Sequence, residues 1–201
     1  MKLLYSGNSP YARRARIAVR ETGVLDRVEE IDLAGRADRI DILLAAGPGA
    51  KVPVLLTDSG VAIWESLIIV RYLDELSGGK LYPSSLAERE TTLQIESAGS
   101  LLLDSLFVRS REKRRDPAEH SPAVIELEAE RARRTYDALE ALGSAMDGRV
   151  DNGTFSVVAA LGYANWRLPE DNWRDGRPAL AACYDALMQR PALAETAPVI
   201  T

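Results

Sequence analysis

Residues 2–13 of the chain, KLLYSGNSPYAR, decide how the first part of the sequence folds. The stretch begins with a short apolar run that stops at Gly7, which predicts a buried strand. Ser9 and Pro10 follow, and they form a typical helix start, because serine caps the first turn and proline has no N–H to leave unsatisfied there. Small apolar side chains then recur at helical spacing up to Gly23. A strand that turns directly into a helix predicts an α/β layer.

The same alternation continues to residue 78. Apolar runs, helical spacing and Gly/Pro breaks predict the order β-α-β-α-β-β-α, which is an α/β fold. After the first helix, the predicted strands and helices occupy residues 28–33, 36–46, 52–56, 61–64 and 65–76. We therefore expect an α/β domain at residues 1–78, followed by a linker at residues 79–84.

The remainder of the chain is predicted to be helical. Helical patterns cover residues 86–115 and 124–146, a shorter apolar segment follows at 155–166, and an i, i+3, i+4, i+7, i+8 stripe starts at Leu180. The pattern therefore predicts an all-α domain at residues 85–201. In its first helix, four leucines are expected to face inward: Leu93, Leu101, Leu102 and Leu106.

Composition excludes several classes of protein. Of the 201 residues, 46% are hydrophobic and 27% charged, so the chain can bury a core. The net charge of −5 argues against a nucleic-acid partner. A single cysteine and a single histidine argue against a metal site or a Cys/His nucleophilic pair. Because no apolar run approaches the ~18 residues of a membrane span and no export signal is visible, we expect a cytoplasmic protein with no membrane partner.

Ser9 is the first of three places in the α/β region that suit a small anionic ligand. Its hydroxyl lies at the positive end of the predicted helix, where it can donate to an anion. A thiol bound there would have its pKa lowered from ~8.5. A plain N-cap is the alternative interpretation of this serine.

The second and third places are the sequences around Pro53 and Ser66. If the Val52–Pro53 bond were cis, the N–H and C=O of Val52 would turn outward and bind an extended peptide, although most X–Pro bonds are trans. Glu65 and Ser66 open a helix straight after a strand. Ser66 can hold a carboxylate while Glu65 accepts from an ammonium, and a carboxylate with an ammonium is the head group of an amino acid. The alternative interpretation is that both are ordinary residues of a helix first turn.

The order of these three places resembles the glutathione transferase family, and the resemblance extends along nearly the whole chain. In the first half the matching stretches are residues 9–13, 51–55, 65–66 with 69–73, and 81–83. In the second half they are residues 160–163 and the span from Arg177-Pro178 to Arg190-Pro191.

The resemblance implies a thioredoxin-like glutathione-binding domain at 1–78, an all-helical second domain and a homodimer. Glutathione would be the co-substrate, with no metal. Ser9 would be the catalytic residue, donating a hydrogen bond to the glutathione sulfur. Glutathione would otherwise be held by Lys51, Val52, the cis-proline Pro53, Glu65 and Ser66, and by Asp104 reaching across from the neighbouring subunit. Asn8 and Tyr11 would shape the substrate pocket.

Other polar residues are expected to be structural. Tyr5 lies close to where tyrosine-type members carry their phenol, but it falls within the strand pattern. Cys183 lies on an apolar helix face and is expected to be a buried thiol, while His120 is expected to be solvated. Five basic residues end the first long helix, where solvation and the helix dipole account for them, with an anionic substrate or partner as the alternative: Arg109, Arg111, Lys113, Arg114 and Arg115.

One feature departs from the family. Members carry a Ser/Thr-x-x-Asp capping box early in the buried helix that residues 155–166 resemble, and the aspartate is missing here. Either the helix lacks a turn, with a capping loss of about 0.5–2 kcal/mol, or a segment is omitted from the sequence.

The expected function is that of a glutathione transferase. It would activate glutathione as a thiolate and attack a small, largely apolar electrophile held between the domains. Two alternatives remain: glutathione-dependent reduction of a peroxide or disulfide, and a non-catalytic binding or scaffold protein of the same fold.

Overall fold

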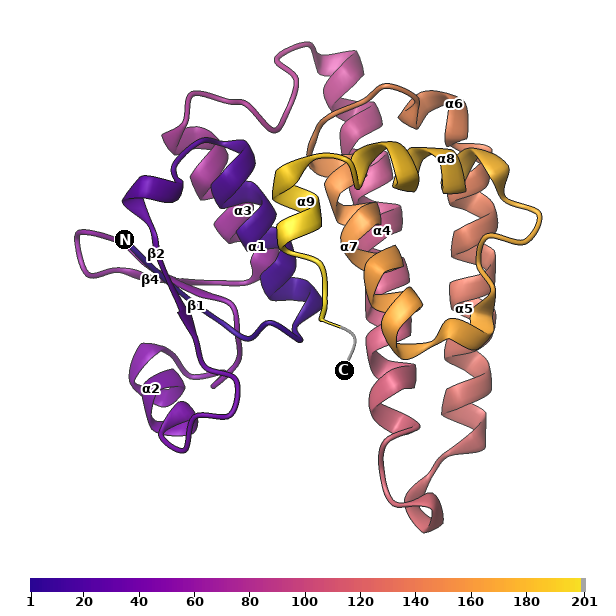
Figure 1. Ribbon diagram of the computed structural model, residues 1–201, viewed down its shortest axis with the longest axis horizontal. Coiled ribbons are helices and arrows are strands. Elements are labelled where there is room, and N and C mark those ends of the chain that lie inside the picture. The colour runs from indigo at the N-terminus through magenta and orange to yellow at the C-terminus, as the bar shows by residue number, and fades with distance from the viewer. Residues whose placement is uncertain (200–201) are drawn as a thin grey trace. The chain divides into compact units, whose positions relative to one another are not determined.

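The computed structural model describes residues 1–199 and divides the chain into two compact units (Figure 1). Unit 1 comprises Met1–Tyr82 and the C-terminal segment that begins at Glu195, and unit 2 comprises Pro83–Ala194. The division between the two units falls at Tyr82 and Pro83. The C-terminal segment differs from the expected domain boundaries, because it belongs to unit 1 and not to the helical unit.

Unit 1 is built on a mixed four-stranded sheet. Its strands are β1 (Lys2–Tyr5), β2 (Glu29–Asp32), β3 (Val54–Leu56) and β4 (Ala62–Trp64), arranged in the order β2-β1-β3-β4. Strands β1 and β2 are parallel, while β3 is antiparallel to both β1 and β4. With its helices the unit has the predicted order β-α-β-α-β-β-α.

Two α-helices and a short 3₁₀ turn (Leu25–Arg27) lie between these strands, and a third α-helix follows β4. Helices α1 (Pro10–Glu21) and α3 (Ser66–Leu76) pack against each other. Helix α2 (Arg39–Ala46) packs through Leu43 on Leu4 and Val54. Because neighbouring side chains in a strand point to opposite faces, Leu3 and Leu55 face the other side of the sheet, where both are fully buried.

An ion-pair cluster links the first helix to the second strand. Arg20 Nη1 on α1 lies 2.7 Å from Glu30 Oε1 on β2, and Arg16 Nε lies 3.3 Å from the same carboxylate. Burial opposes ionisation of Glu30, but the hydrogen bonds from Arg20 and the charges of Arg16 and Arg20 hold its pKa below its usual value. Arg20 Nε also lies 3.4 Å from Glu195, which ties the C-terminal segment to α1.

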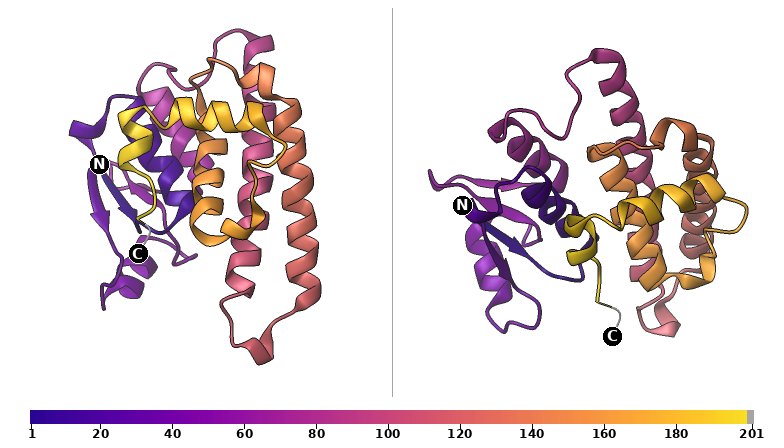
Figure 2. Two further views of the ribbon diagram at one scale, coloured as in Figure 1. Left: turned by 45° about the vertical axis from the view of Figure 1, so that its right-hand side comes forward. Right: turned by 45° about the horizontal axis from the view of Figure 1, so that its top comes forward.

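Unit 2 is all-helical (Figure 2). Its longest helix, α4 (Leu86–Glu112), packs against α5 (Pro122–Ala141) and α7 (Asn152–Arg167). Every residue of α7 from Asn152 to Ala164 is buried, so α7 is the core helix of the unit. The shorter elements are α6 (Gly143–Met146), α8 (Pro178–Leu187), α9 (Pro191–Glu195) and 3₁₀ turns at Pro117–Glu119 and Pro169–Asp171.

A glycine allows α4 and α7 to approach closely. A Cβ atom on Gly99 of α4 would lie 2.9 Å from the backbone N of Val157 on α7, closer than real Cβ atoms approach. Any larger residue at position 99 would therefore push the two helices apart.

The prediction of the buried face of α4 is only half right. Leu102 and Leu106 are fully buried, but Leu93 is 38% exposed and Leu101 is 64% exposed within this chain. Apolar side chains lie on more than one face of this long helix, and spacing alone does not indicate which face packs against α5 and α7.

The expected loss of the helix cap is also wrong. Helix α7 begins with a complete capping box, in which Asp151 Oδ1 accepts from Thr154 N at 3.2 Å and Thr154 Oγ1 accepts from Asp151 N at 3.4 Å. The two residue types are reversed relative to the family pattern, and the box precedes residues 155–160. Helix α7 therefore lacks neither its cap nor its first turn.

Among residues 1–199, no helix is long and apolar enough to cross a membrane. Nor do His, Cys, Asp and Glu side chains of this range form a group of three or more that would hold a metal ion.

Candidate functional site

Three polar segments emerge at one end of the sheet in unit 1. The strand registers place Leu4 opposite Val54, and Val54 opposite Trp64, in one row across β1, β3 and β4. Because β3 is antiparallel to its neighbours, the chain after β1, the chain before β3 and the chain after β4 all leave the sheet at this end. Residues 6–9, 51–53 and 65–66 are thus brought together by strand pairing, with neighbouring strands about 4.8 Å apart.

Ser9 is the N-cap of α1. Its backbone is extended (φ −90°, ψ 116°), and its Oγ accepts a hydrogen bond from Ala12 N at 3.2 Å. The capping bond uses a lone pair of the hydroxyl, so the hydroxyl hydrogen remains able to donate to a ligand. The cap and the donor interpretations of Ser9 are therefore compatible.

The Val52–Pro53 peptide bond is cis, as the resemblance implied. Pro53 is buried directly before β3, Val52 is half-buried, and Lys51 is exposed. The exposed charge of Lys51, followed by the half-buried residue Val52, suits the binding of an extended peptide that ends in a carboxylate.

Glu65 stands at the N-cap of α3 with a left-handed backbone (φ 67°, ψ 120°). A non-glycine residue in this region costs of the order of 1–3 kcal/mol, and such residues cluster at functional sites. Within the described chain, no side chain caps the start of α3. Its first-turn N–H groups and the buried Ser66 hydroxyl are therefore suited to binding a carboxylate.

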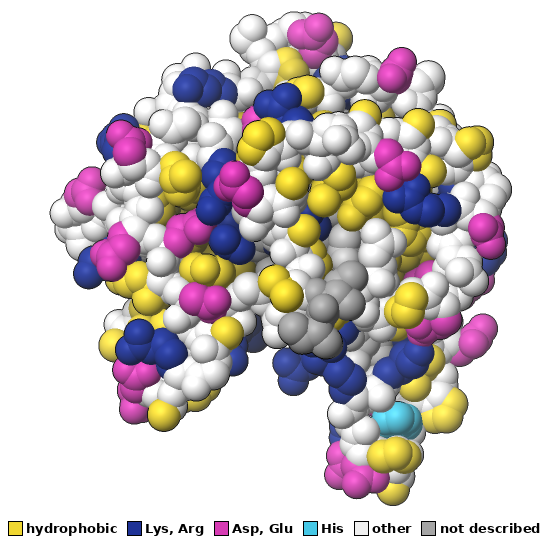
Figure 3. Space-filling view, in the orientation of Figure 1, with side chains coloured by type: hydrophobic (Ala, Val, Ile, Leu, Met, Phe, Trp, Pro, Cys, Tyr) yellow, Lys and Arg dark blue, Asp and Glu magenta, His cyan; other side chains and the backbone are white. Residues whose placement is uncertain are grey.

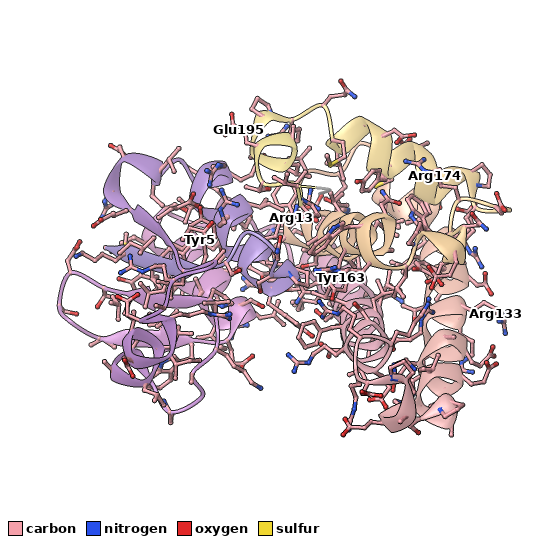
Figure 4. All side chains as sticks on the ribbon, turned by 60° about the horizontal axis from the view of Figure 1, so that its bottom comes forward. Tyr5, Arg13, Arg133, Tyr163, Arg174 and Glu195 are labelled. Atoms are coloured by element: carbon pink, nitrogen blue, oxygen red, sulfur yellow. The ribbon has the colours of Figure 1, made fainter. Side chains whose placement is uncertain are left out.

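Tyr5, which Figure 4 labels on unit 1, is a poor candidate for an ionised phenol. Burial raises its pKa, and the nearby charges of Asp32 and Glu30 act in the same direction. Arg16 opposes this effect with its guanidinium carbon 4.4 Å from the ring centroid, but the pKa stays above its usual value. Tyr5 therefore keeps its proton at neutral pH, in line with the structural role predicted for it.

The remaining predicted site residues fall in both units. Asn8 is exposed and Tyr11 half-buried, on either side of Ser9 in unit 1. Asp104 lies on α4 in unit 2, and it is exposed. Strand pairing in unit 1 thus determines where the predicted site residues of that unit lie. It says nothing about Asp104, which lies on a helix of unit 2.

The residues predicted to be structural differ in part from expectation. Cys183 is half-buried, and burial raises its pKa to about 11, so it is an inert thiol. His120 is half-buried in the loop between α4 and α5 (Figure 3), with Nε2 2.9 Å from Arg115 O. In the basic run, Arg109 is buried and paired with Asp171, and Lys113 pairs with Glu170. The expected solvation is therefore wrong for Arg109, while Lys113 is exposed.

A contact that the sequence did not suggest lies beside two of the three segments. The indole Nε1–H of Trp64, the last residue of β4, donates to Ala46 O at 2.9 Å. The contact requires glycine at position 47, because a Cβ there would lie 2.0 Å from Trp64 Nε1. Trp64 directly precedes Glu65, and Gly47 begins the loop that leads to Val52. This contact therefore holds the loop after α2 against the turn before α3.

We expect Gly47→Ala to disturb this end of unit 1. The added methyl group would displace the Trp64 ring and break its hydrogen bond, at a cost of about 1–3 kcal/mol. Gly49→Ala, in the same loop, is the matched control, since a Cβ there meets no atom within 4 Å. Calorimetry with glutathione should show weaker binding for Gly47→Ala alone; equal binding by both variants would contradict a role for this contact in the site.

Comparisons with known proteins agree with these observations. A family model described as the N-terminal domain of glutathione S-transferase matches residues 8–76. An uncharacterized GST-like protein of Escherichia coli K12, YibF, is 29% identical over 98% of both chains. A glutathione transferase family member of Pseudomonas fluorescens Pf-5, solved with bound glutathione, is 30% identical over 99% of both chains, with a TM-score of 0.91.

A second structure of a family member from the same organism covers 100% of both chains at 28% identity, with a TM-score of 0.88. It holds S-(propanoic acid)-glutathione. The fold, the polar segments at one end of the sheet and the full-length match at 30% identity lead to one conclusion: this chain belongs to the glutathione transferase family.

Proposed function

We propose that the protein is a glutathione transferase that binds glutathione on unit 1 and activates it as a thiolate. The observation that carries the proposal is the strand register. It brings a donor hydroxyl, a cis-proline segment and an uncapped helix start to one end of the sheet. Together these features provide partners for the thiol, the peptide backbone and the amino-acid head of glutathione.

Each part of glutathione has a partner in this arrangement. The α-carboxylate of the γ-glutamyl group would bind the Ser66 hydroxyl and the N–H groups of α3, and its ammonium would bind Glu65. The N–H and C=O of Val52 beside Pro53 would pair with the cysteinyl backbone, and Lys51 would bind the glycyl carboxylate. Asp104 of a second subunit in a homodimer would add a further contact, and Asn8 and Tyr11 would border the electrophile.

Ser9 would act on the sulfur. Its hydroxyl donates to the sulfur, and the N-terminus of α1 favours negative charge beside it, so the thiol loses its proton to solvent at neutral pH. The thiolate then attacks the electrophilic carbon, a C–S bond forms, and the leaving group departs with its bonding electrons. No metal or redox partner enters this step.

Similar structures support conjugation at sulfur. The Pseudomonas fluorescens proteins hold glutathione in one structure and a glutathione whose sulfur carries propanoic acid in the other. The second ligand has the chemical form of a conjugate. We propose the same ligand class for this chain.

Calorimetry with glutathione tests the proposal. We expect binding of glutathione but not of cysteinylglycine, which lacks the γ-glutamyl group, and Ser66→Ala should weaken glutathione binding about tenfold. Ser77→Ala at the other end of α3, where Oγ donates to Asp74 O at 2.9 Å, is the matched control and should bind normally. No heat at millimolar glutathione would overturn the enzyme proposal and leave a scaffold of the same fold.

A further inference from the structure

Arginine and aromatic side chains alternate where α4 and α7 end in unit 2. The Phe107 and Tyr163 ring centroids lie 6.4 Å apart, and those of Tyr163 and Trp166 lie 6.0 Å apart in an edge-to-face arrangement. Arg111 lies over Phe107 at 5.8 Å, and Arg167 lies over Trp166 at 3.3 Å. We call this group, together with Arg114, the Arg167 cluster.

The positive charges of the Arg167 cluster have no acidic partner among residues 1–199. Arg111, Arg114 and Arg167 make no ion pair there, although nearby cations of the same helix end do: Arg109, Lys113 and Arg115. The Nε atom of Arg167 is buried without a hydrogen-bond partner. Burial, and then the charge of Arg114, lower the pKa of Arg167. Both effects disfavour the charged form of its guanidinium group.

A second arginine–aromatic group in unit 2 provides the comparison. Arg174 lies over Trp173 at 4.6 Å and over Tyr184 at 5.3 Å. There, however, Asp185 pairs with the guanidinium at 2.7 Å. Figure 4 labels Arg174 and Tyr163, which belong to the two groups. The Arg167 cluster has the same construction without the carboxylate.

Stabilisation of the helix dipole does not account for this arrangement. A cation near the end of a helix is favourable, and Arg167 is the last residue of α7. Arg167 alone places a positive charge at the end of α7. The cluster also draws on a second helix end, because Arg111 belongs to the last turn of α4, so guanidinium groups without an ion pair among residues 1–199 lie over one chain of aromatic rings from two helices.

We propose that the Arg167 cluster binds a planar aromatic ring that carries a carboxylate. The ring would pack on Phe107 and Trp166, which are half-buried, and the carboxylate would accept hydrogen bonds from the guanidinium groups, which suit its planar geometry. The cluster belongs to unit 2, and the inference does not depend on the glutathione-binding segments of unit 1.

Binding of an unreactive pair of ligands tests the site without glutathione. The probes are 3,5-dinitrobenzoate and its neutral amide, titrated by calorimetry. The native protein should prefer the carboxylate about tenfold, and Arg167→Gln should abolish the preference. Arg114→Gln, at an exposed position, should reduce it and guards against a folding defect in the first variant. Arg174→Gln should keep it.

The proposed site would be overturned if the native protein bound both probes equally or bound neither. It would also be overturned if Arg174→Gln removed the carboxylate preference as fully as Arg167→Gln. A parallel titration with glutathione separates this failure from that of the proposed function. Carboxylate preference without glutathione binding would overturn the proposed function and support the site. Glutathione binding without the carboxylate preference would support the proposed function and overturn the site.

Discussion

Replacement of Ser9 by alanine is expected to lower kcat/KM for glutathione conjugation by about a hundredfold, the effect of removing one hydrogen-bond donor from a developing anion. The Ser9 hydroxyl caps α1 through its lone pair and is able to donate its hydrogen to the sulfur. Ser9→Ala removes this donor and leaves the backbone that binds the rest of glutathione. The loss should therefore appear in the rate far more than in the affinity for glutathione.

Two variants separate donation from helix capping. Ser9→Thr keeps a hydroxyl and a capable N-cap, and should retain most of the activity. Ser121→Ala removes the equivalent cap of α5, where Oγ accepts from Val124 N at 3.4 Å, and should leave kcat/KM unchanged. If Ser9→Ala were as active as native protein, or if Ser121→Ala lost as much activity, Ser9 would be a cap only.

Asp151→Ala is expected to lower the free energy of unfolding of unit 2 by about 3–5 kcal/mol, the cost of breaking a buried charge pair. Asp151 is 4% exposed and accepts hydrogen bonds from Thr92 Oγ1 at 2.7 Å and Arg149 Nη1 at 2.9 Å. It also caps α7, the core helix. Its removal would leave the Arg149 guanidinium without a carboxylate partner and the first turn of α7 without its cap, although Thr92 would keep its bond to Glu88 O.

Asp116→Ala is the matched control for this prediction. Asp116 caps an exposed 3₁₀ turn through a single bond from Ala118 N at 2.9 Å. Its loss should cost no more than about 1 kcal/mol. Urea unfolding followed by circular dichroism compares the two variants, and equal destabilisation would mean that the buried network of Asp151 contributes nothing beyond a cap.

The α/β layer was predictable because its signals are local. Apolar runs, the Ser9-Pro10 helix start and the turn at residues 58–60 act through neighbouring residues, and each observed strand lies within its predicted range. The resemblance also implied the cis bond before Pro53, which spacing alone argued against. Local sequence and family pattern together were enough for the order of strands and helices in unit 1.

Features that depend on distant residues were not predictable. The exposure of Leu93 and Leu101 depends on which face of α4 meets α5 and α7. The contact of Trp64 with the chain at Gly47 was not predictable either. In the sequence, Gly47 has the pattern of a residue that ends a helix, and nothing connects it with a tryptophan 17 residues later. The capping box of α7 was missed for a different reason: aspartate and threonine both accept from backbone N–H groups, so the box works in either order.

The central claim is that Ser9 stabilises glutathione as a thiolate. The measurement that tests it most directly is the ultraviolet thiolate absorbance of bound glutathione as a function of pH, in native protein and in Ser9→Ala. We predict a band that titrates well below the free-thiol pKa of ~8.5 in native protein and returns toward that value in the variant. A bound thiol with an unshifted pKa in native protein would contradict the account.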